Sequence, residues 1–344
     1  MASATTLPPE AAPGAAHGTA QGGAPAALPP AAPGFFGLTR AQGIALLVMV
    51  GALIAFPFFL YPQFLMKLLC FALFACAFNL LIGYVGLLSF GHAAYFGMGS
   101  YVAGHAVKMW GLTPELSILL GGAVGAGLGL VFGWIAIRRA GIYFAMITLA
   151  LAQMVYFFCL QAPFTHGEDG IQSIPRGMLF GVIDLRSDMT LYWFVAALFL
   201  AGFLLVQRII RSPFGQVLTA IRENEPRATS LGYRVDDYKL VAFVLSAGIA
   251  GVAGGAKAIT VGIATLTDVH WSMSGEVVLM TLLGGLGTLF GPVVGAGIVV
   301  AMQTYLAPFG AWVTIIQGAI FVLCVLAFRA GIVGELGRLL RVKL

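Results

Sequence analysis

Long apolar runs, interrupted by glycine rather than by charge, fill this chain from Gly43 to Phe328. Of its 344 residues, 60% are hydrophobic and only 9% are charged, whereas soluble domains carry about 25% charged residues. A soluble fold of this size could not remove so much apolar surface from water, but a chain surrounded by lipid has no need to. The runs are continuous and do not alternate with period two, so they favour membrane-spanning helices over a transmembrane β-barrel.

Ten segments approach the length of about 20 apolar residues that a membrane span needs. The sequence therefore predicts an all-α fold, a polytopic transmembrane helical bundle of about ten spans. The predicted spans are 43–61, 64–82, 88–107, 116–137, 142–160, 190–209, 238–261, 274–288, 290–306 and 311–328.

The polar parts of the chain suggest how it is organised. Residues 1–38 are mainly Ala, Pro and Gly with almost no charge, so we expect a disordered tail. No basic region precedes an early apolar stretch there, which argues against a secretory signal peptide. We expect a transmembrane domain over 39–330, with a cytoplasmic loop at 210–237, and a cytoplasmic tail at 331–344.

The net charge of +5 comes from lysines and arginines that gather in a few loops. They occur at 138–139, within 208–239 and within 329–343, and the predicted helix count puts all three regions on one side together with Arg40. By the positive-inside rule this side is cytoplasmic, so both termini are expected there. The loop 161–189 falls outside. This pattern suits topology and lipid headgroups better than nucleic acid.

Two glycine-rich segments, 79–104 and 284–297, interrupt the apolar pattern. Irregular backbone at membrane depth is tolerated only where it is buried in protein or lines a watery cavity. Glycine- or proline-interrupted segments in corresponding places of two halves indicate a substrate path in transporters. A second interpretation is that the glycines let helices approach closely, and both can hold.

Ionisable residues inside apolar runs are costly and are functional candidates by default. His92 is expected to bond a neighbouring helix, and Lys257 to extend along its helix towards the outer surface. Glu276 either lies in a solute pathway or caps the start of its helix. The four cysteines show no CxxC spacing, so neither a disulfide framework nor a metal site is expected. No phosphate-binding loop or catalytic motif occurs, so we expect neither an enzyme nor a cofactor.

A polar stretch within 211–239 predicts two short helices between two spans. Ser212 and Pro213 are a typical helix start, and residues 214–223 carry apolar side chains at helical spacing. Pro226 ends or kinks this helix, and a second one stops at Gly232. Since most connections are shorter, the pair indicates a docking surface; an interfacial helix lying on headgroups is the alternative.

Four ordered blocks resemble a known family. They are NLLIGYVGLLSFGHAAYFGMGSYVAG (79–104), GIYFAMITLALAQ (141–153), SPFGQVLTAIRENEPRATSLGY (212–233) and SGEVVLMTLLGGLGTLFGPVVGA (274–296). The sequence from about 64 to 328 resembles the LivM-type permeases, the transmembrane subunits of ABC importers for branched-chain amino acids.

The resemblance implies a permease of the large ABC importer type in the bacterial inner membrane. Its partners would be a second, LivH-like permease, two cytoplasmic ATPases and a periplasmic amino-acid-binding protein. ATP-driven alternating access would move leucine, isoleucine and valine. Residues implied to line or support the pathway are Asn79, Ser89, His92, Tyr95, Gly97 and Glu276. Residues implied to couple the chain to the ATPases are Arg222, Glu223, Asn224, Glu225 and Gly232. Pro226 and Arg227 depart from the broader importer pattern, which has two alanines there.

Three other functions remain open at this point. The first is a permease of the same family whose solute is urea, a short amide or an aromatic acid instead of leucine, isoleucine and valine. A secondary transporter driven by an ion gradient would need intramembrane carboxylates, and Glu276 is almost the only candidate. A membrane enzyme is disfavoured because the catalytic motifs are missing.

Overall fold

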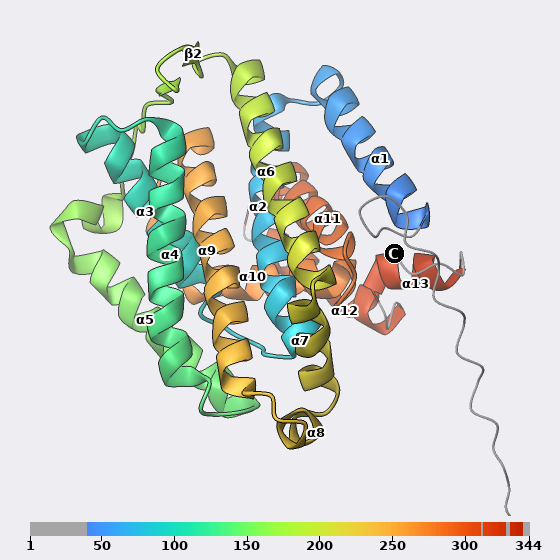
Figure 1. The fold of residues 1–344 in the computed structure, drawn as a ribbon. Coiled ribbons are helices and arrows are strands. Elements are labelled where there is room, and N and C mark those ends of the chain that lie inside the picture. Colours follow the sequence, from blue (N-terminus) through green and yellow to red (C-terminus); the bar gives the residue numbers. More distant parts are fainter. Residues whose placement is uncertain (1–39, 311, 328–330, 340–344) are drawn as a thin grey trace, which may run out of the picture. The chain divides into compact units, whose positions relative to one another are not determined.

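The computed structural model describes residues 40–310, 312–327 and 331–339, which form α-helices joined by turns and one two-stranded hairpin (Figure 1). The predicted tail at 1–38 lies outside the described residues. The helices are α1 (Arg40–Ala55), α2 (Pro62–Asn79), α3 (His92–Met109), α4 (Pro114–Ala136), α5 (Ile142–Gln161), α6 (Asp188–Arg211), α7 (Pro213–Glu223), α8 (Glu225–Ser230), α9 (Val235–Val261), α10 (Trp271–Gly284), α11 (Gly291–Tyr305), α12 (Trp312–Ala327) and α13 (Gly331–Leu339). The hairpin pairs β1 (Met178–Leu179) with β2 (Ile183–Asp184) in antiparallel fashion.

The all-α prediction is confirmed, and each predicted apolar run contains a helix. The number of ten spans is not confirmed. Among the described residues, five helices are long and apolar enough to cross a membrane. These are Pro62–Val85, Pro114–Ala136, Ile142–Gln161, Asp188–Arg211 and Val235–Val261. The other apolar helices are shorter or less apolar, because glycine, proline and polar residues end them early.

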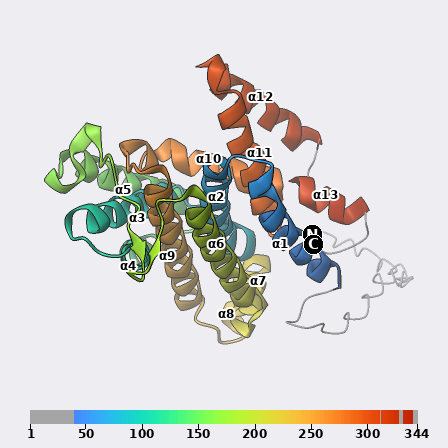
Figure 2. The same ribbon diagram turned by 90° about the horizontal axis from the view of Figure 1, so that it is seen from above.

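Helix α9 is the centre of the packing, with α2, α3 and α4 against it. In both ribbon views α3, α4 and α5 lie on one side of α9, while α2, α6 and α11 lie on the other (Figures 1 and 2). Glycines allow this closeness: a methyl group on Gly99 would come within 2.7 Å of the Gly251 Cα. A Cβ on Gly254 would overlap the Phe96 carbonyl. The close-packing interpretation therefore holds at these glycines.

The two ends of the bundle differ in chemistry. Helix α6 leads directly into α7 and α8, while the β1–β2 hairpin precedes α6 at the opposite end (Figure 1). Arg138, after α4, lines a hollow with Asp236 and Asp237 at the start of α9, so the basic α4–α5 turn lies at the α7–α8 end. Two of the predicted basic regions thus meet at one end.

The expected C-terminal tail begins as a helix. Helix α13 packs against α10 and α11, and Gly331, Val333 and Gly337 are buried there. The backbone of Gly331 is so close to Gly285 that a side chain would not fit between them.

Candidate functional site

The two glycine-rich segments meet at one buried side chain, that of Asn79. Its Nδ2 donates to the Thr288 carbonyl at 2.9 Å, and its Oδ1 accepts from the Gly287 amide at 3.0 Å. Asn79 is 2% exposed, so both bonds are shielded from water. One amide thus satisfies two backbone groups of a loop 208 residues further along the chain. The two segments, which the sequence places at corresponding positions in two halves of the chain, are therefore in direct contact.

Directly after Asn79 the chain forms a π-helical turn, Leu80–Val85, which ends at Gly86. Gly86 has φ +83°, a left-handed conformation that glycine adopts without strain. Single π-helical turns often mark functional positions in helices. Here the turn exposes the Gly83 carbonyl to a side chain from another element.

That side chain is Arg222, near the end of α7. Its Nη1 donates to the Gly83 carbonyl. A Cβ on Gly86 would lie 3.1 Å from the Arg222 Cγ, and one on Gly287 would lie 3.2 Å from its Nη1. The guanidinium therefore sits where the π-helical turn and the 284–290 loop meet, and glycine leaves the room for it. We call this group of Asn79, Gly83, Gly86, Arg222 and Gly287 the junction.

Helix α7 begins as the sequence predicted, and α7 and α8 each carry an N-cap. The break between the two helices lies at Asn224 and not at Pro226, which belongs to the first turn of α8. The Ser212 Oγ accepts from the Gly215 amide at 3.3 Å, and Pro213 follows at the first helical position. The Asn224 Oδ1 accepts from the Arg227 amide at 3.0 Å and starts α8. Asn224 thus has a local capping role.

Other contacts fix α8 to the bundle. Lys239 of α9 is 4% exposed and pairs with Glu225 at 2.6 Å. Gly232, at φ +89°, makes the turn from α8 towards α9. Glu223 differs, since its side chain is exposed and makes no hydrogen bond or ion pair with any residue that the structure describes.

His92 is fully buried and bonds a neighbouring helix, as expected. Its Nε2 lies 2.8 Å from the Ser246 Oγ on α9. Ser246 donates its own proton to the Ala77 carbonyl at 2.6 Å, so the His92 ring is the donor to Ser246. This chain of bonds connects α3, α9 and α2.

Two serines organise the start of α3. The Ser89 Oγ accepts from the Gly91 amide at 3.1 Å. Ser274 of α10 donates to the Phe90 carbonyl at 2.7 Å and accepts from the Ala93 amide at 3.0 Å. Ser274 satisfies a free amide at the N-terminus of α3, and the sequence analysis had not included it among the site residues.

Tyr95 and Gly97 lie deeper in the same helix. Tyr95 is fully buried, and its hydroxyl finds no hydrogen-bond partner within the described part of the chain. An unpaired buried hydroxyl is uncommon in native folds. Gly97 faces Val269, whose Cα would lie 2.9 Å from an added Cβ.

Lys257 does not extend towards the outer surface, so that prediction is wrong. It is 8% exposed, and its Nζ lies 2.6 and 2.8 Å from the two carboxylate oxygens of Asp268, which is 2% exposed. The Thr265 amide also donates to Asp268, at 3.2 Å. Sequence analysis missed the pair because Asp268 lies in the turn between two helices, outside any apolar run.

Glu276 reaches another helix instead of capping its own. The N-cap of α10 is His270, whose ring accepts from the Ser272 amide. The Glu276 Oε2 accepts a hydrogen bond from the Gln303 Nε2 of α11 at 2.8 Å.

A cavity of about 790 Å³ opens at the end of the bundle away from α7 and α8. Its walls come from the starts of α2 and α6, the ends of α9 and α11, and the loop before β1. Three charged residues line it: Lys67, Arg176 and Asp188. None of the six predicted pathway residues lines this cavity, although Glu276 adjoins it through Gln303. The rule that selected Lys257 would also have selected Lys67, which interrupts the second apolar run.

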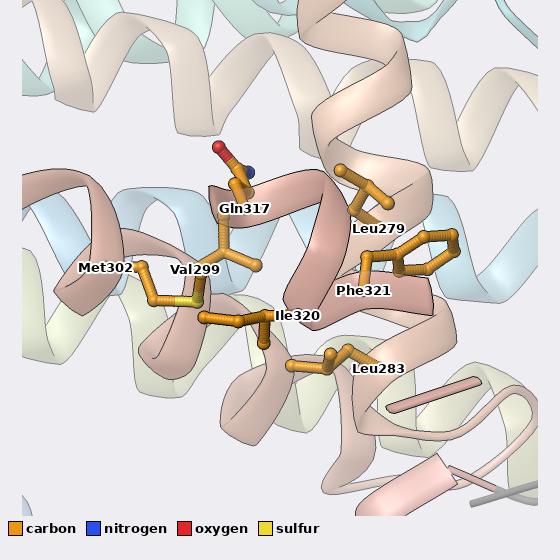
Figure 3. A pocket seen from close by; sticks show the side chains of 7 residues that line it. All are labelled: Leu279, Leu283, Val299, Met302, Gln317, Ile320 and Phe321. Atoms are coloured by element: carbon orange, nitrogen blue, oxygen red, sulfur yellow. The ribbon is translucent and has the colours of Figure 1, made fainter. Parts of the chain in front are cut away.

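A second hollow, between α10, α11 and α12, is too small for a solute (Figure 3). Its volume is about 10 Å³, roughly one water molecule. Gln317 is the polar side chain in its lining; the other six are apolar.

These features define a class: a multi-pass helical membrane protein, with a polar helix pair at one end and an open cavity at the other. The family model described as "Branched-chain amino acid transport system / permease component" matches residues 60–325. Since the match covers well over half of the chain, the chain belongs to this family, which makes it a permease of ABC importers.

Curated relatives agree with that membership. The high-affinity branched-chain amino acid transport system permease protein LivM of Salmonella typhimurium is 26% identical over 317 residues, 85% of this chain and 75% of LivM. LivM of Escherichia coli matches to the same extent. The corresponding LivH permease of E. coli is 24% identical over 77% of this chain and 91% of LivH. No solved structure matches significantly.

Proposed function

We propose that this chain is the membrane subunit through which two ATPases drive the import of leucine, isoleucine and valine across a bacterial inner membrane. A second, LivH-like permease would complete the membrane part, and a periplasmic binding protein would deliver the solute. The family membership and the LivM and LivH relatives support this proposal.

The observation that carries the proposal is the contact of Arg222 with the Gly83 carbonyl. An ATPase that binds α7 and α8 would move Arg222, and through it the π-helical turn between α2 and α3. The turn is already bound to the 284–290 loop through Asn79. Motion of one short helix would therefore reach both glycine-rich segments at once.

A polar helix pair can pass on force only if it is fixed to the bundle. Ile221, Ala228 and Val235 form a small apolar cluster between α7, α8 and α9, and the ion pair of Lys239 with Glu225 adds a second fixed point. Glu223 is exposed beside them and is the residue we expect to face the ATPase. Bound nucleotide would then shift the equilibrium between two packings of the bundle, with no chemistry on the solute.

The test is uptake of radiolabelled leucine by the complete transporter in proteoliposomes, with ATP hydrolysis measured in parallel. Arg222→Met removes a hydrogen bond from a charged donor; for an exposed side chain we take about 1 kcal/mol, or roughly fivefold in an equilibrium. We expect leucine moved per ATP to fall by about that factor, and charge reversal in Arg222→Glu or Glu223→Arg to lower it further.

Arg208→Met is the matched control, because Arg208 lies on α6, outside the α7–α8 pair, and its exposed side chain contacts no described residue through a hydrogen bond or ion pair. It should leave uptake unchanged. Normal coupling in both Arg222 variants would remove the basis of the proposal. So would leucine movement driven by an ion gradient in the purified chain without ATPases, which would favour the secondary transporter. Competition by urea, short amides or aromatic acids at the binding protein would redirect the solute assignment.

A further inference from the structure

We propose that the cavity at the end away from α7 and α8 is a solute site, in which Lys67 binds the carboxylate of an α-amino acid and Gln303, backed by Glu276, faces its ammonium. The inference rests on the proposed function for the identity of the solute. The residues and their roles come from the cavity itself.

The first argument is the charge balance of the cavity wall. Arg176 and Asp188 pair with each other at 2.6 Å, so their charges compensate. Lys67 has no such partner, because among the described residues no carboxylate lies within 4 Å of its Nζ. The Nζ lies over the Phe71 ring, 5.8 Å from the ring centroid. Lys67 belongs to α2, a membrane-span candidate, where a charge without a close partner is costly. The Glu276 carboxylate acts on Lys67 electrostatically from beyond ion-pair distance. The cavity therefore presents to an incoming anion an ammonium that no carboxylate contacts directly.

The second argument is the polarity of the α11 wall. The Gln303 Nε2 donates to Glu276 at 2.8 Å, which orients the amide. The Gln303 oxygen accepts no hydrogen bond from the described residues, so it is available to a donor in the cavity. Glu276 lies directly behind and adds negative charge. A donor group with positive charge, such as an ammonium, suits this side.

The third argument is size and reach. The cavity of about 790 Å³ lies within the range of roughly 300–1,000 Å³ typical of small-molecule sites. The two walls face one cavity because the start of α2 packs against the end of α11, where the Phe64 and Tyr305 rings lie 5.9 Å apart. Phe64 and Val261 supply apolar lining beside the charged groups. A small zwitterion with an aliphatic side chain matches this combination.

The test is protection of a cysteine in the cavity wall of the complete transporter in phosphatidylcholine liposomes. Thr304→Cys adds a thiol at an exposed position of the lining. We expect L-leucine to slow alkylation of this thiol, and L-leucinol, which lacks the carboxylate, to do so only at concentrations about 10- to 100-fold higher, as for the loss of one hydrogen bond to a charged group. Lys67→Met should remove the difference between the two compounds, and Lys67→Arg should keep it.

Lys108→Met is the matched control, since Lys108 lies at the same end, outside the cavity lining, with its Nζ on the Gln172 carbonyl. Equal protection by leucine and leucinol in the unsubstituted Lys67 background would overturn the proposal. An unchanged difference between leucine and leucinol in Lys67→Met would also overturn it. So would protection that requires anionic lipid and does not depend on leucine, because Lys67 would then bind a lipid headgroup. The proposed function is tested separately by ATP-driven leucine uptake. Normal uptake together with equal protection by leucine and leucinol would therefore refute only the solute site and leave the proposed function standing.

Discussion

Replacing Lys257 by methionine should destabilise the protein strongly, because it leaves the Asp268 carboxylate buried without its cation. The two groups are 8% and 2% exposed, and the Nζ lies 2.6 and 2.8 Å from the carboxylate oxygens. Breaking a buried pair by removing one partner costs about 3–5 kcal/mol. Asp268 keeps the bond from the Thr265 amide, so we expect the lower value of about 3 kcal/mol, on the order of 100-fold in the unfolding equilibrium.

The measurement is the free energy of unfolding of the purified chain in mixed micelles, titrated with sodium dodecyl sulfate and followed by tryptophan fluorescence. Two controls make it specific. Lys257→Met combined with Asp268→Asn removes both charges while keeping an oxygen for Thr265, and it should recover most of the loss. Arg234→Met breaks an exposed pair with Asp237, whose atoms lie 3.1 Å apart, and should cost at most about 0.5 kcal/mol. A Lys257→Met variant as stable as the unsubstituted chain, or a double variant no better than the single one, would refute the reasoning.

Two further predictions concern the packed segments. Asn79→Leu removes the partner of the Gly287 amide and the Thr288 carbonyl; at about 1–3 kcal/mol for each group left unpaired, the 284–290 loop should loosen, seen as faster hydrogen exchange of the Gly287 amide. Unchanged exchange there would mean that the loop is held by other contacts. Gly254→Val should prevent folding, because the new side chain overlaps the Phe96 carbonyl and neither backbone can give way; a monodisperse chain in size-exclusion chromatography would contradict this. Gly43→Val, at a position with open space, is its control.

How much the sequence could predict depended on the range of the interaction. The N-cap pattern at Ser212 and Pro213 is local, so α7 was predicted almost to the residue. The bond of His92 to a neighbouring helix followed from a general rule, that a buried polar group needs a partner, but Ser246 as that partner lies 154 residues away and no pattern points to it. Lys257 was misjudged for the same reason.

Local sequence patterns also could not show which predicted site residues contact each other. Arg222 and Asn79 meet in the junction, from positions far apart in the chain. Ser89, His92, Tyr95 and Gly97 lie in packed protein beside it, and their part in a solute pathway stays a prediction. The cavity with Lys67 was not predicted, since its walls come from four helices that only the packing brings together.

The sequence by itself determined that the chain is a helical membrane protein, because apolar run length, charge placement and local caps act over one or two helical turns or over the whole composition. Its similarity to known permeases, and not these patterns, identified the family. The tertiary structure decided which charges are paired, where glycines permit contact between backbones, and where space remains for a solute. Those properties depend on distances between helices, and such distances exist only once the helices have packed.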